Sequence, residues 1–274
     1  MTRKQVATSA IGKQHKINES LLGRIEGAQT RIRTKTVLFA LLELYDVEAE
    51  RREELIDLWT RDREGTEDWV TAIRPSMSAG MTTFVGLEGL ADHMRIYAPV
   101  VVPGLFQTER YTRALFEIGQ PIHDMRMSYV RDHVALRMER KRRVFERQPQ
   151  PVKVHAVISE AALITTVGSE KVMEDQLANI VMLSRLPYVE VQILPLRTRG
   201  SVYRAQQDFA VLTMPDPIKS FVQSDTVWGA STTSDKPREV EHFTTAFNSM
   251  SSSALAPELT PEYLHNLIKE RVTT

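Results

Sequence analysis

The residues most suited to chemistry lie near the N-terminus. Residues 1–36 include eight lysines and arginines but only two acidic residues, a net charge of +6, whereas the whole chain has 35 of each and no net charge. Cationic side chains gathered on one segment neutralise DNA phosphates, and short polar groups at the start of a helix contact base edges. The segment therefore predicts a DNA contact.

A helix beginning at Asn18 and ending at Gly27 is the element expected to enter a DNA groove. Asn18 is a favourable N-cap and Gly27 a favourable C-terminal residue, while Leu21, Leu22 and Ile25 form an apolar face. Polar or cationic side chains are expected to contact the DNA from this helix and from the segments beside it: Arg3, Lys4, Gln5, Asn18, Glu19, Ser20, Arg24, Gln29, Arg31 and Arg33.

Further helices are needed to position that one. A short helix capped by Thr2 precedes it and is followed by a polar connector through Gly12, while two more helices are predicted after Thr34 and over 48–62. Residues 1–62 are thus expected to form a small all-helical bundle. Residues 63–83 have weak periodicity and several turn formers, which predicts a linker.

The remainder, residues 84–274, mixes helix and strand patterns. Alternating apolar residues predict strands at 152–158, 188–194, 208–214 and 218–224, and residues 92–97 fit either a strand or a helix. Helices are predicted at 108–118, 124–147, 169–185, 236–249 and 261–271. Consecutive strands late in the chain favour a partly antiparallel sheet, and the fold class expected is therefore α+β.

Enzyme motifs are scarce. The chain has no cysteine, none of its seven histidines is paired with another at i+3 or i+4, and the common phosphate-loop, dinucleotide and hydrolase motifs are missing. The segment Val167–Lys171 is interpreted as a turn with Ser169 as the N-cap of the next helix. We therefore expect no catalytic residue, no metal site and no cofactor.

Two features of the larger domain suit a partner or a ligand. The run 138–147 is rich in arginine; its alternatives are a solvated helix face, an acidic protein partner and an auxiliary DNA contact. The stretch VVVPGLFQTERYTRALF (100–116) is interpreted mainly as scaffold, with Thr108 as a helix cap. The residues expected to face a partner or ligand are Gln107, Arg140, Arg142 and Arg143.

Longer motifs resemble a known family. KINESLLGRIEGAQTRIRTKTVLFALLELYDVEAERREEL resembles the second half of an Xre-type, Cro/repressor-like helix-turn-helix. The segments PVVVPGLFQTERYTRALF, ERKRRVF, VISEAALITTVGSEKVMEDQLANIV, VEVQILPL and QDFAVLTM resemble the large domain of actinobacterial regulators of the WhiJ-like type. This resemblance implies a transcriptional regulator that works with a small partner protein of the BldB-like type. The LRxLRE-like helix that usually opens such a motif is expected to be missing here.

Three functions are weighed from these observations. The first is a cytoplasmic, homodimeric transcriptional regulator that binds double-stranded DNA through residues 1–62 and senses a small protein partner or a ligand through residues 84–274. The second is a protein-interaction adaptor or antitoxin-like partner without strong DNA binding. The third is an enzyme or small-molecule receptor with a pocket in the α+β domain. No apolar run approaches the roughly 20 residues that span a bilayer.

Overall fold

The structure is a computed structural model that describes residues 2–26, 30, 32–66, 79–123, 127–197, 203–216, 218–225 and 231–273. The chain divides into two compact units, Met1–Trp69 and Val70–Thr274. Each unit has its own buried apolar residues, so each is described by itself.

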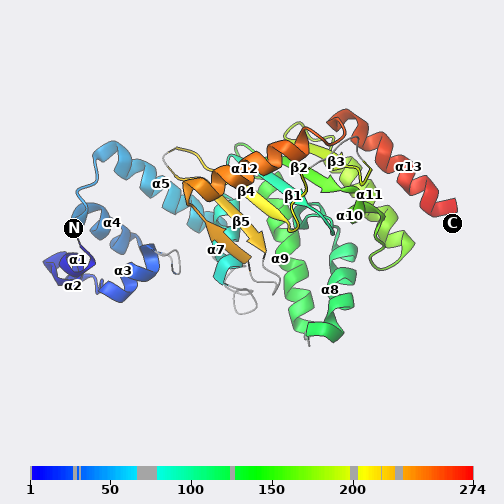
Figure 1. The fold of residues 1–274 in the computed structure, drawn as a ribbon. Coiled ribbons are helices and arrows are strands. Elements are labelled where there is room, and N and C mark those ends of the chain that lie inside the picture. The colour runs from blue at the N-terminus through cyan, green and yellow to red at the C-terminus, as the bar shows by residue number, and fades with distance from the viewer. Residues whose placement is uncertain are drawn as a thin grey trace. The chain divides into compact units, whose positions relative to one another are not determined.

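The first unit is all helical (Figure 1). Its helices are α1 (Arg3–Thr8), α2 (Ala10–Gln14), α3 (Glu19–Glu26), α4 (Lys35–Leu44) and α5 (Ala49–Thr66). Side-chain oxygens of Thr2, Ser9, Asn18 and Thr34 accept backbone N–H groups at helix starts. These bonds satisfy donors that a helix N-terminus leaves unpaired.

The connector expected after α1 is wrong in part, because residues 10–14 form the helix α2. Ser9 ends α1 and caps α2, which lets the chain turn at one residue. The stretch 63–83 predicted as a linker is helical at both ends of its described part: α5 continues to Thr66 and α7 begins at Ala79. Residues 67–78 lie outside the described residues.

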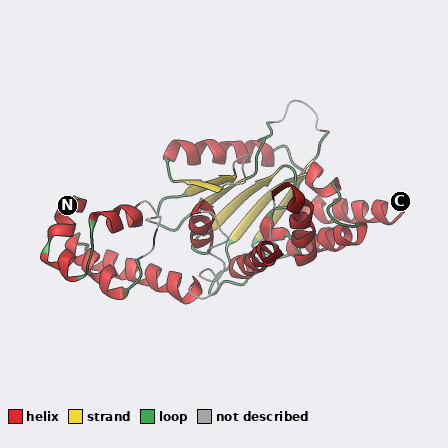
Figure 2. Cartoon of the chain, turned by 90° about the horizontal axis from the view of Figure 1, so that it is seen from below, coloured by secondary structure: helices red, strands yellow, loops and turns green. Residues whose placement is uncertain are grey.

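The second unit is built on a six-stranded sheet (Figure 2). Its strands are β1 (His93–Ala98), β2 (Lys153–Ser159), β3 (Val189–Leu194), β4 (Phe209–Thr213), β5 (Phe221–Asp225) and β6 (Ser231–Ser234), in the order β3-β2-β1-β4-β5-β6. β1, β2 and β3 are parallel, while β4 is antiparallel to β1 and begins an antiparallel run through β5 and β6. The predicted α+β class and partly antiparallel sheet are confirmed.

Helices cover both faces of the sheet. Between β1 and β2 lie η2 (Gly104–Phe106), α8 (Glu109–His123) and α9 (Met127–Phe145); between β2 and β3 lie α10 (Glu160–Ile164) and α11 (Glu170–Leu183). The chain ends with α12 (Pro237–Ser251), η3 (Pro257–Leu259) and α13 (Thr260–Thr273). α12 packs its Phe247 and Met250 on one face, and the larger core with α11 and α13 covers the other. No helix among the described residues combines the length and apolar character needed to cross a bilayer.

Candidate functional site

The surface of α3 is held in place by a small core. Val6 of α1, Leu22 of α3 and Leu41 of α4 pack together with Ile17 and Ala40, and all five are buried. The Trp59 indole N–H of α5 donates to the Ile32 carbonyl at 2.8 Å. α3 is thus braced by helices that precede and follow it in the chain.

A left-handed residue directs the chain into α3. Lys16 has a φ of 54°, and the Ile17 N–H donates to the Gly12 carbonyl at 2.8 Å while the Lys16 N–H donates to the Lys13 carbonyl at 3.2 Å. This pair of bonds is a Schellman motif, which satisfies carbonyls at the end of α2. Asn18 Oδ1 then accepts the Leu21 N–H at 2.8 Å and starts α3.

The described members of the predicted DNA-contacting set are all exposed: Arg3, Lys4, Gln5, Asn18, Glu19, Ser20, Arg24 and Arg33. Within this set, Arg3 pairs with Glu26 at 2.5 Å, the Gln5 side chain accepts the Thr2 N–H at 2.7 Å, and Asn18 caps α3. Gln29 and Arg31 lie outside the described residues.

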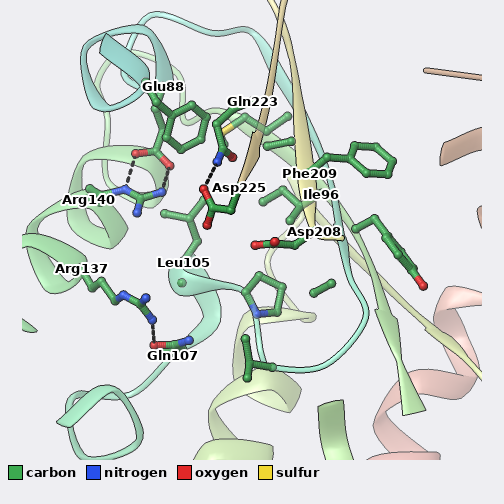
Figure 3. A pocket seen from close by; sticks show the side chains of 18 of the residues that line it. Glu88, Ile96, Leu105, Gln107, Arg137, Arg140, Asp208, Phe209, Gln223 and Asp225 are labelled. Carbon is green, nitrogen blue, oxygen red and sulfur yellow. Dashed lines mark hydrogen bonds and ion pairs between the residues drawn. The ribbon is translucent and has the colours of Figure 1, made fainter. Parts of the chain in front are cut away.

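The second unit contains a polar cavity of about 100 Å³, here called the α9 cavity (Figure 3). It lies among α7 (Ala79–Glu88), β1, the segment 101–107, α9 and the adjoining ends of β4 and β5. Its charged lining residues come from α7, α9, β5 and the position directly before β4: Glu88, Arg137, Arg140, Asp225 and Asp208. The volume exceeds that of one water molecule but is small for a drug-sized ligand.

Arg140 and Glu88 form a buried ion pair on one wall of the cavity. Arg140 Nε and Nη2 each donate to a carboxylate oxygen of Glu88 at 2.8 Å, and the two side chains are 11% and 2% exposed. The Arg140 guanidinium also lies over the Phe84 ring, 5.2 Å from its centroid. The bidentate geometry neutralises both charges and fastens α7 to α9.

Arg137 lies one turn before Arg140 on the same helix. Its Nη1 donates to Gln107 Oε1, and its guanidinium lies 5.0 Å from the centroid of the Phe116 ring. Gln107 Oε1 also accepts the Thr112 hydroxyl at 2.9 Å, while Gln107 Nε2 donates to the Val102 carbonyl at 2.6 Å. Burial and then the neighbouring Arg140 lower the pKa of Arg137 to about 10, so it remains charged at neutral pH.

Two aspartates lie across the cavity, Asp208 directly before β4 and Asp225 at the end of β5. β4 and β5 are antiparallel with Phe209 opposite Ser224, which brings Asp208 and Asp225 opposite each other at the next step of the register. Gln223 Nε2 donates to Asp225 Oδ1 at 2.7 Å. Burial, and then the charge of Asp225, raises the pKa of the Asp208 carboxyl.

The structure separates the predicted partner-binding residues. Gln107 and Arg140 line the α9 cavity, and Gln107 is 1% exposed. Arg142 and Arg143 instead bond to Glu139 on α9 and do not line the cavity. Sequence reasoning missed Glu88, Arg137, Asp208 and Asp225; the one local signal was the i,i+3 spacing of Arg137 and Arg140, which places both on one face of α9.

Most of the second unit matches a protein family that has no assigned activity. Residues 81–266 match the family described as Domain of unknown function (DUF5753). No curated protein matches the chain.

Proposed function

We propose that this chain, which belongs to the DUF5753 family, is a DNA-binding transcriptional regulator. The observation that supports the proposal best is α3: its Leu22 is buried in the first unit, while Glu19, Ser20 and Arg24 are exposed on the same helix. A helix fixed on one side and polar on the other is suited to a major groove. The +6 charge of residues 1–36 supplies attraction to phosphates.

In this proposal the two units have different tasks. The first unit binds double-stranded DNA, and a homodimer in the cytoplasm engages two half-sites. The second unit receives the signal, either from a small protein of the BldB-like type or from a ligand. The proposal assigns no catalytic step to the chain.

The test begins with the purified full-length protein and a pool of random DNA duplexes. Duplexes enriched by repeated binding are titrated by fluorescence anisotropy at low and moderate salt. Affinity should fall steeply with salt because lysine and arginine contacts release counterions from DNA. Arg24→Ala should weaken binding by about 1–3 kcal/mol, or roughly five- to 150-fold.

Arg51→Ala is the matched control, because it removes one arginine from α5, where Arg51 pairs with Glu54 at 3.2 Å. Equal binding by the Arg24 and Arg51 variants would refute the assignment of α3 as the recognition helix. Failure to enrich any duplex, together with the absence of salt-dependent binding, would refute the DNA-binding function itself.

The alternative is a protein-interaction adaptor. It is favoured by Phe39 and Tyr45, which are 40% and 42% exposed on and just after α4. Apolar side chains of this size are enriched where proteins meet. Phe39→Ser with Tyr45→Ser should abolish co-purification of a small partner if the adaptor function holds, whereas the regulator should keep its DNA affinity in that variant.

A further inference from the structure

The α9 cavity has opposite charges on facing walls that are not paired with each other. Arg137 extends from α9, and Figure 3 shows the Asp208 and Asp225 carboxylates directed into the space on the strand side. Among the described residues, no carboxylate forms an ion pair with Arg137, and no cation forms one with Asp208 or Asp225. Arg140 and Glu88 form an ion pair with each other, so this pair does not neutralise the charges of Arg137, Asp208 and Asp225.

Arg137 retains hydrogen-bonding capacity toward the cavity. A guanidinium has five N–H donors in a planar fork that suits a carboxylate. Within the described chain, Arg137 makes one hydrogen bond, to Gln107, whose oxygen is shared with Thr112. Burying a cation with so few acceptors costs free energy, and an anionic group that reached the fork would recover much of it.

The two aspartates on the other side of the cavity are suited to a cationic group. Like charges directly opposite each other on neighbouring strands are destabilising. Gln223 Nε2 donates to Asp225, whereas the Asp208 carboxylate accepts its own backbone N–H. A group with several N–H donors and a positive charge would bridge the two carboxylates.

We propose that the α9 cavity binds a small zwitterion of the amino-acid class, with its ammonium group on Asp208 and Asp225 and its carboxylate on Arg137. A simple cation would leave Arg137 without an anionic acceptor, and a simple anion would leave the repulsion between the two aspartates uncompensated. The volume of about 100 Å³ and the apolar side chains of Phe84, Ile96 and Leu105 in the lining restrict the ligand to a small aliphatic body. Its role as an effector rests on the proposed regulatory function; its binding rests on the cavity alone.

The test uses isothermal titration calorimetry with the full-length protein. The probes are glycine, L-alanine, β-alanine and 4-aminobutanoate, which place the two charges at increasing separation. Propionate and propylamine are the matched controls with one charge each. We expect saturable binding of at least one amino acid with one site per chain, and at least tenfold weaker binding of both controls.

Two substitutions examine the two walls. Asp208→Asn keeps the shape and relieves the repulsion from Asp225, so it should preserve or raise the melting temperature while weakening amino-acid binding at least tenfold. Arg137→Met should weaken binding to the same degree. Glu139→Gln, on the same helix but outside the cavity lining, should leave affinity within twofold.

Several results would overturn the proposal: no probe binds, propionate or propylamine binds as well as the amino acids, or Asp208→Asn retains full affinity. Anisotropy titrations with an enriched duplex, with and without the amino acid, separate this inference from the proposed function. Amino-acid binding by a protein that binds no DNA would refute the regulator and support the cavity. DNA binding without amino-acid binding would refute the cavity alone.

Discussion

Replacing Glu88 by glutamine is expected to destabilise the second unit more than any exposed charge change. Glu88 is 2% exposed and receives two hydrogen bonds of 2.8 Å from Arg140. Glutamine keeps the shape but removes the charge and turns an NH₂ group toward the guanidinium. Arg140 then remains buried beside Arg137, whose pKa is already lowered to about 10 by burial and then by Arg140.

The magnitude follows from the burial of the pair. Unit charges about 4 Å apart attract by about 4 kcal/mol at an effective dielectric constant near 20. Desolvation offsets part of this attraction in the intact pair, but removing one partner leaves the desolvated charge uncompensated, which costs about 3–5 kcal/mol. At about 2–4 °C per kcal/mol for a unit of this size, Glu88→Gln should lower the melting temperature by about 10 °C.

Urea and thermal unfolding followed by circular dichroism measure the effect. The control is Glu139→Gln, the same chemical change on α9, where Glu139 pairs with the exposed Arg142; exposed pairs contribute about 0–1 kcal/mol. The double variant Glu88→Leu, Arg140→Met removes both charges and should recover most of the loss. If Glu88→Gln costs no more than Glu139→Gln, the pair is not buried in solution and the reasoning fails.

Three further predictions concern the backbone and pH. A Cβ on Gly12 would lie 2.0 Å from the Val6 carbonyl oxygen, so Gly12→Ala should destabilise the first unit by about 1–3 kcal/mol in urea unfolding, whereas Gly89→Ala, with open space around it, should leave the stability of the second unit unchanged. Lys16→Gly should stabilise that unit by about 1 kcal/mol because Lys16 has a left-handed φ, and an unchanged midpoint would contradict this. Burial, then Arg95, lowers the pKa of His93 from 6.5 to about 4. As the pH drops from about 6.5 toward 4, His93 becomes protonated in the unfolded chain before it does so in the folded chain, so the free energy of unfolding falls. His93→Gln should flatten this dependence on pH, whereas substitution of the exposed His242 by glutamine should not.

Local signals made much of the secondary structure predictable. Asn18, Thr34, Thr108 and Ser169 were expected at helix starts, and each side chain accepts a backbone N–H three residues ahead. Strand alternation likewise located β2 and β3, whose inward residues are buried. These features depend on residues within one or two turns of each other, so a single segment contains the information.

Elements without such a local pattern were missed. β6 has the sequence STTS, which lacks apolar alternation, and it forms a strand because β5 offers a partner along Val222–Asp225. The connector was expected to run through Gly12, yet the cap at Ser9 and the close contact of Gly12 with Val6 allow the helix α2 over Ala10–Gln14. In these places tertiary context decides the structure more than propensity does.

The α9 cavity was less accessible to sequence reasoning for a different reason. Glu88, Arg137, Asp208 and Asp225 are charged residues of common types on four separate segments of the chain, and the sheet register and the packing of α9 bring them together. Gln107 was expected to face a partner or ligand. It lines the cavity, but its side chain also joins Val102, Thr112 and Arg137, which a single-sequence pattern does not reveal.

The inward face of α9 explains why the cavity and the scaffold share residues. Val134 and Val144 of α9 are buried, and Arg137, Arg140 and Lys141 lie between them along the helix. Each cation needs an acceptor from another element: Glu88 of α7 serves Arg140, and Asn179 of α11 accepts from Lys141 at 2.9 Å. Within the described residues, the acceptor for Arg137 is the Gln107 oxygen that Thr112 also uses. Two of the three cations therefore fasten helices together, and the third is left with donors for a ligand, which makes a change at Arg137 the one most expected to alter binding without loosening α7 or α11.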